Sequence, residues 1–143
     1  MREFITPKTD WEYGDALNVE DYNRIRNNLL YLNDKCNTHF PPDVIIDLGE
    51  EKTLTDNYYA SEFNAFEDAL ESINERAYRY DIGSKMTFNQ LGKFIGYEER
   101  NRLESGCLRL YKMFEQIEQK SRRTAFRANG TDFEDSGENQ WQA

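Results

Sequence analysis

The strongest constraint on the fold is an apolar pattern that occurs three times along the chain. Six positions spaced 3, 3, 4, 3 and 4 residues apart begin at Val19, and the same spacing recurs from Ala60 and from Tyr97. Side chains at these intervals share one face of an α-helix. The sequence therefore predicts three amphipathic helices. Their stripes are Val19, Tyr22, Ile25, Leu29, Leu32 and Cys36; Ala60, Phe63, Phe66, Leu70, Ile73 and Ala77; and Tyr97, Arg100, Leu103, Cys107, Leu110 and Phe114.

Each stripe needs an apolar partner, because an isolated helix of this length is marginal in water. We therefore expect a mainly α fold, a three-helix bundle of three loop–helix repeats, in residues 1–119. The links are about twenty residues long, too long for simple bundle turns. They repeat as well: Asp47-Leu-Gly49 precedes the second helix and Asp81-Ile-Gly83 the third, and both glycines are expected at positive φ.

One polar position repeats in every helix. Asn23, Asn64 and Asn101 each follow the second stripe position by one residue, although Asn is a poor helix former. We expect each amide to bond the backbone of its own incoming loop or of the neighbouring unit. The alternative is three Asn side chains exposed to solvent. Asn18, with Asp21 three residues later, is typical of a helix N-cap with its reciprocal partner.

The character of the chain changes near Gln119. Residues 120–143 are expected to form an arm that begins with a short basic patch and ends in an acidic, flexible tail. Asn129-Gly130 predicts a β-hairpin turn between strands at 124–127 and 131–133. Such a hairpin is barely stable alone, so it must pack on the bundle or on another chain.

Composition and motifs exclude several classes of function. The chain has 143 residues and two cysteines. Its net charge is -9, so its electrostatic field repels nucleic acid and anionic lipid. It has neither an apolar run long enough to cross a bilayer nor a signal-peptide h-region. We therefore expect no nucleic-acid partner, no membrane association and no secretory export.

The side chains that could carry chemistry are few. Cys36 and Cys107 fall on the stripes and are expected to be buried and reduced, and His39 lacks the partners of a zinc site or a catalytic triad. No Walker A or dinucleotide motif is present. The carboxylates of the second helix are expected to lie mostly on its polar face, where solvation is the default: Glu62, Glu67, Asp68, Glu71 and Glu75. We expect no catalytic residue, no metal, no cofactor and no enzymatic activity.

Several segments resemble small virion proteins encoded among the tail genes of phages and prophages of Gram-positive bacteria. They are Lys8-Thr-Asp-Trp11, Asn18–Ile25, Asn28–Leu32, Asp47–Thr53, Glu62–Glu67 and Arg122-Arg-Thr-Ala-Phe126. The resemblance extends to about Arg127, and Arg100 departs from it, since the two earlier units carry an aromatic there. It implies a tail or baseplate-region protein, made in the host cytoplasm and incorporated into the virion.

From this resemblance we expect a non-catalytic adaptor that links the tail to a fibre or receptor-binding component. Its partners would be other virion proteins, in multiple copies within a symmetric assembly. The alternative is a soluble, acidic interaction or inhibitor protein of phage origin outside the virion. Aromatic and Arg side chains are favoured at interfaces, so the partner-binding candidates are Arg122, Arg123, Phe126, Arg127, Phe133 and Trp141. Phe126 and Phe133 could instead close the bundle, and Trp11 is expected in the core.

Overall fold

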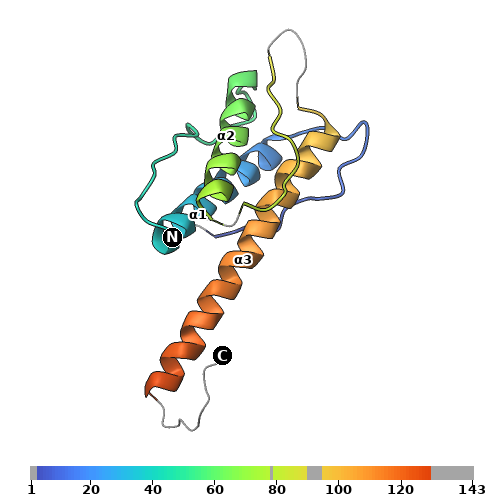
Figure 1. Ribbon diagram of the computed structural model, residues 1–143. Coiled ribbons are helices and arrows are strands. Elements are labelled where there is room, and N and C mark those ends of the chain that lie inside the picture. The colour runs from blue at the N-terminus through green and yellow to red at the C-terminus, as the bar shows by residue number, and fades with distance from the viewer. Residues whose placement is uncertain (1–2, 78, 90–94, 130–143) are drawn as a thin grey trace. The chain divides into compact units, whose positions relative to one another are not determined.

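A computed structural model describes residues 3–77, 79–89 and 95–129 (Figure 1). The fold is mainly helical, as predicted, with helices α1 (Val19–His39), α2 (Ala60–Arg76) and α3 (Tyr97–Asn129) and no strand among the described residues. The chain divides into two compact units, Met1–Tyr111 and Lys112–Ala143, with the boundary inside α3. No helix within the described residues is long and apolar enough to span a membrane.

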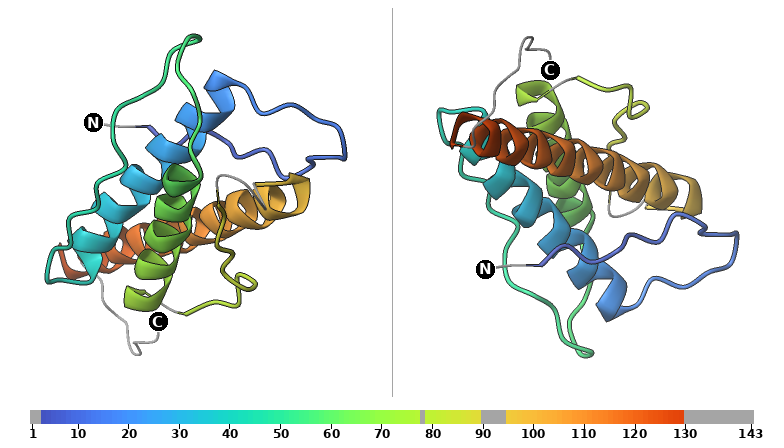
Figure 2. Two further views of the ribbon diagram at one scale, coloured as in Figure 1. Left: turned by 90° about the horizontal axis from the view of Figure 1, so that it is seen from above. Right: turned by 90° about the horizontal axis from the view of Figure 1, so that it is seen from below.

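The helices of the first unit all run in the same general direction, as Figures 1 and 2 show from three sides. Loop 1 (residues 3–18) precedes α1, loop 2 (residues 40–59) precedes α2, and loop 3 precedes α3 with 79–89 as its longest described part. A helix of 21 residues such as α1 is about 30 Å long at 1.5 Å per residue. Each loop must run back along such a helix before the next one starts, which explains why the links are long.

The predicted stripes form the core of the first unit. Their side chains within this unit are buried, except that Ala77, Tyr97 and Arg100 are part-exposed. An aromatic cluster lies between α1 and α2, where the ring of Tyr22 is 5.7 Å from that of Phe63 and 5.0 Å from that of Phe66. Full burial of one such side chain is worth about 1.5–3 kcal/mol. The repeated spacing therefore identified the packing faces correctly.

The helix starts and the loop turns also repeat. The backbone N–H before each helix donates to a carboxylate three residues later: Asn18 to Asp21 (3.0 Å), Tyr59 to Glu62 (2.8 Å) and Gly96 to Glu99 (3.2 Å). Asn18 accepts in return from the Asp21 N–H, which confirms the predicted cap. Gly49 and Gly83 have φ of 73° and 84°, as expected, and each donates its N–H to the Asp two residues before it.

The structure differs from the predicted arm at 124–127, where α3 continues as a helix through Asn129 instead of ending near Gln119. Extending an existing helix avoids the cost of nucleation, whereas an isolated hairpin is barely stable. An Asn-Gly pair suits a helix C-terminus as well as a hairpin turn. The first predicted strand is therefore wrong, and the second, at 131–133, lies outside the described residues together with the acidic tail.

Candidate functional site

The three repeated asparagines hold the loops of neighbouring units. In each case the amide Oδ1 accepts the backbone N–H of one loop residue and Nδ2 donates to the carbonyl of that same residue. Asn23 binds Lys52 in loop 2 (2.8 and 3.0 Å), Asn64 binds Phe88 in loop 3 (2.7 and 2.9 Å), and Asn101 binds Trp11 in loop 1 (2.8 and 2.9 Å). Each asparagine binds the loop of the next loop–helix repeat, and the asparagine of the third repeat binds the loop of the first. The three repeats therefore close into a ring.

Three further asparagines make the same paired contact, and the repeat did not single them out. Asn28 binds Ile5 (2.9 and 2.8 Å), Asn37 binds Val44 (3.0 and 3.1 Å) and Asn74 binds Tyr80 (3.0 and 2.7 Å). Each amide satisfies two backbone groups of a loop that has no strand partner, and buried backbone groups are rarely left unpaired. The loops are thus held by side chains where a sheet would use backbone pairing.

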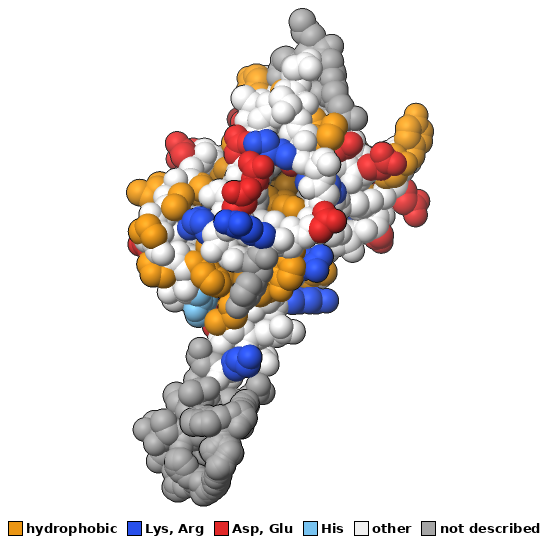
Figure 3. Space-filling model, viewed as in Figure 1, with side chains coloured by type: hydrophobic (Ala, Val, Ile, Leu, Met, Phe, Trp, Pro, Cys, Tyr) orange, Lys and Arg blue, Asp and Glu red, His pale blue; other side chains and the backbone are white. Residues whose placement is uncertain are grey.

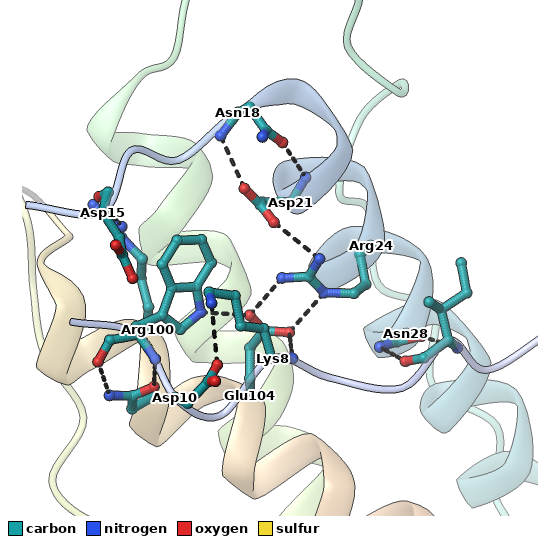
Figure 4. A network of polar contacts seen from close by, with 12 residues as sticks. Lys8, Asp10, Asp15, Asn18, Asp21, Arg24, Asn28, Arg100 and Glu104 are labelled. Atoms are coloured by element: carbon teal, nitrogen blue, oxygen red, sulfur yellow. Dashed lines mark hydrogen bonds and ion pairs between the residues drawn. The ribbon is translucent and has the colours of Figure 1, made fainter.

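A buried carboxylate lies where the ring closes (Figure 4). Glu104 of α3 is 1% exposed, and its Oε1 accepts from the Lys8 N–H (3.1 Å) and from Arg24 Nε (2.9 Å). Its Oε2 accepts from Trp11 Nε1 (2.8 Å) and Arg24 Nη2 (2.7 Å). Arg24 also donates from Nη1 to Asp21 Oδ1 (2.9 Å). This network joins loop 1, α1 and α3 through one fully engaged carboxylate.

An equivalent ion pair joins α2 and α3. Glu67 of α2, equivalent to Glu104, is 2% exposed and binds Arg102, which is equivalent to Arg24. Burial raises the pKa of Glu67, while hydrogen bonds from Arg102 and from the Met86 backbone oppose the shift. The prediction of a solvated Glu67 is therefore wrong. Aligning the second and third helices places Glu67 at the same position as Glu104. This equivalence was the sequence signal that pointed to a shared role.

The third interface uses a cation in that register. Arg26 of α1 occupies the position equivalent to Glu67 and Glu104, and it donates from Nε (2.8 Å) and Nη2 (2.6 Å) to the Gly49 carbonyl of loop 2. These bonds are exposed to solvent. Three equivalent positions thus hold loops by two different chemistries.

Arg100, which breaks the apolar pattern of the third stripe, packs on a tryptophan. Its guanidinium carbon lies 4.7 Å from the ring centroid of Trp11, and Nη1 donates to the Asp15 carbonyl (2.8 Å). Burial lowers the pKa of Arg100. Trp11 is 3% exposed, which confirms its place in the core. At the equivalent site in the first stripe the roles are exchanged, because Lys52 of loop 2 lies over the ring of Tyr22 (5.1 Å).

The reactive side chains are placed as core or loop residues. Cys36 and Cys107 are free and buried, as predicted, and burial raises the pKa of both thiols. His39 is half-buried at the end of α1. Within the described part of the chain, no group of three or more His, Cys, Asp or Glu side chains is placed to hold a metal ion.

The predicted partner-binding residues all follow the first unit. Arg122 is exposed on α3, and Arg123, Phe126 and Arg127 lie in the same helix, with only their backbone described. Phe133 and Trp141 lie outside the described residues. Their role in contacts therefore stays a prediction.

Two loop tips present apolar side chains in the same register, six residues before a helix. Tyr13 is 90% exposed and Leu54 is 87% exposed. Each lies in a turn closed by an aspartate: the Asp15 N–H donates to the Glu12 carbonyl (3.0 Å) and the Asp56 N–H to that of Thr53 (3.1 Å). The aspartate carboxylates accept the Glu12 and Thr53 N–H groups (2.9 and 2.8 Å). These rigid apolar tips are the candidate protein-binding surface of the first unit.

The chain matches no protein-family model, and no curated protein or solved structure matches it significantly.

Proposed function

We propose that this chain is a non-catalytic structural protein of a tailed-phage virion, an adaptor in the tail or baseplate region that joins the tail to a fibre or receptor-binding component. The proposal rests on the sequence resemblance given above and on one structural observation that fits it. That observation is the exposure of large apolar side chains on turns that are themselves fixed.

Exposed apolar residues are common singly on protein surfaces, so their setting matters. Tyr13 and Leu54 are held by equivalent turns, and each turn directly follows a residue that an asparagine fixes: Trp11 by Asn101 and Lys52 by Asn23. A loop already ordered loses little conformational entropy on binding. Such a surface suits a subunit that docks in a defined orientation.

The buried charges favour a structural role over a catalytic one. Both oxygens of Glu104 accept two hydrogen bonds each, and Glu67 is paired with Arg102. A general acid or base needs a carboxyl group that reaches substrate. These carboxylates instead hold loops and helices together, which supports an interaction protein without enzymatic activity.

Quantitative mass spectrometry of purified particles tests the proposal. Phage particles from a host that carries the gene should contain this chain at a fixed ratio to the tail proteins. After mild dissociation removes the fibres, the particles should either still contain this chain or have lost it together with the component that it binds. Absence from intact virions, with the chain present in the soluble lysate, would instead support an inhibitor outside the particle, and a lytic band in zymography would support a hydrolase.

A further inference from the structure

We propose that copies of this chain associate head to tail, with the basic C-terminal part of α3 of one copy docked in a groove beside Tyr13 of the next. The groove lies between the tip of loop 1 and the first turn of α3, and we call it the tyrosine groove. Its lining includes Tyr13, Asp15, Tyr97, Glu98, Glu99 and Arg100. This inference deepens the proposed structural role by naming a partner, a second copy of the same chain.

The tyrosine groove has the chemistry that recognises a cation. The rings of Tyr13 and Tyr97 meet edge to face, with centroids 6.3 Å apart, and Tyr13 is 90% exposed. Asp15 and Glu98 are exposed carboxylates beside these rings. Aromatic faces and carboxylates together bind guanidinium and ammonium groups. Figure 3 shows hydrophobic and acidic side chains adjacent on the side where loop 1 and the start of α3 lie.

The cation already in the groove is engaged within the chain. Arg100 donates to the Asp15 carbonyl and lies over the ring of Trp11, on the inner side of loop 1. The lining also carries two exposed carboxylates, those of Asp15 and Glu98. The groove keeps a net negative charge that a basic partner would complement.

The complementary surface is a segment of the same protein. Residues 119–129 carry Lys120, Arg122, Arg123 and Arg127 and no acidic residue, whereas the whole chain has a net charge of -9. This segment is helical, and Arg122 is exposed on it. In a protein that is otherwise strongly acidic, two copies repel each other except where this segment meets a carboxylate-rich surface.

The two surfaces lie on different parts of the chain. Glu98 lies in the first turn of α3 and Arg122 in its C-terminal part, and the proposed contact joins the one surface of one copy to the other surface of the next. Two different surfaces that bind each other make a heterologous interface, which generates rings or open series of copies. A subunit that occurs in several copies within a symmetric virion assembly would need such a repeated contact between copies.

Complementary variants of the full chain provide the test. The groove variant, Tyr13→Ala with Glu98→Lys, and the helix variant, Arg122→Gln with Arg123→Gln, each retain one of the two surfaces. In sedimentation velocity at low salt, the unmodified chain should form a concentration-dependent series of oligomers, and each variant alone should be monomeric. An equimolar mixture should stop at a heterodimer, because the remaining two surfaces of that dimer are disabled.

The controls separate lost contact from lost fold. Ile45→Ala with Glu75→Lys makes the same kinds of change at an exposed apolar side chain of loop 2 and at another exposed carboxylate, and it should assemble like the unmodified chain. Tyr13→Ala alone, at an exposed position, should raise the dissociation constant at least about tenfold. A monomeric unmodified chain at every concentration, variants that assemble normally, or a mixture without heterodimer would each overturn the inference. None of these results depends on whether the chain occurs in particles, which mass spectrometry decides separately.

Discussion

Loops 1 and 2 are held in the same register but by different chemistry. Loop 1 meets α3 through the buried Glu104 and its Arg24 partner, whereas loop 2 meets α1 through solvent-exposed bonds from Arg26 to the Gly49 carbonyl. The asparagine contacts of the two interfaces join residues 90 and 29 apart in sequence. Closing the longer loop costs about 1 kcal/mol more. Of the two loops, the one that closes the longer span is held by the buried carboxylate.

The largest expected effect comes from removing the carboxylate that closes the ring. Glu104→Leu leaves the half-buried Arg24 without its main partner and the buried Trp11 Nε1–H unpaired. Loss of one partner of a buried ion pair costs about 3–5 kcal/mol. Urea denaturation followed by circular dichroism measures the change in the free energy of unfolding. A loss below about 1 kcal/mol would show that the two interfaces do not differ, and Glu104→Gln, which keeps the shape, should lose less than Glu104→Leu.

The asparagine contacts provide a matched comparison. Asn101→Ala and Asn23→Ala each remove two hydrogen bonds to one loop residue. An unsatisfied buried polar group costs about 1–3 kcal/mol. We expect a loss of about 2–3 kcal/mol for Asn101→Ala and about half of that for Asn23→Ala, because Trp11 is buried and Lys52 is less so. Equal losses would remove the distinction between the two loops.

The raised pKa of Glu67 predicts how the second interface responds to pH. The folded state holds this proton more tightly than the unfolded state, whose Glu has its ordinary pKa of 4.5. Unfolding therefore releases a proton, and the contribution of Glu67 to stability falls as pH rises from about 4.5 through the folded pKa. The unmodified chain should lose stability relative to Glu67→Gln over that window. A difference that stays constant or grows with pH, measured by denaturation at a series of pH values, would contradict this.

The smallest effect is expected at loop 2. Arg26→Ala removes two hydrogen bonds to the Gly49 carbonyl, both exposed to water. Water replaces such a donor, so we expect a loss of less than about 1 kcal/mol. Hydrogen exchange of the amides near Gly49 should quicken while that of loop 1 stays unchanged. Faster exchange in loop 1 as well, or a loss as large as that of Glu104→Leu, would mean that both loops depend on one shared network.

The stripes and the repeated asparagines could be predicted because both follow helical periodicity. Tyr22 and Phe63 recur at matching sites, and Asn64 is a poor helix former that needs a compensating contact. The pattern did not show which loop each amide binds, since the closure of α3 on loop 1 depends on how the helices are arranged in space. Glu67 was misassigned because a charged residue next to a stripe is usually solvated.

The helix through Asn129 illustrates a different limit. Local sequence around Asn129-Gly130 fits a hairpin and a helix end equally well, and the helix already present before it decides between them. The predicted partner-binding residues on this helix have no such internal check, because the contacts predicted for them would belong to other chains.

The closure of α3 on loop 1 also sets an order of events during synthesis. Trp11 leaves the ribosome early, yet its partners Asn101 and Glu104 are translated about ninety codons later. The nascent chain can pair α1 with α2 before that point, but its first segment has no docking site until most of the domain has been translated. Completion of this fold therefore has to wait until Asn101 and Glu104 of α3 have been translated.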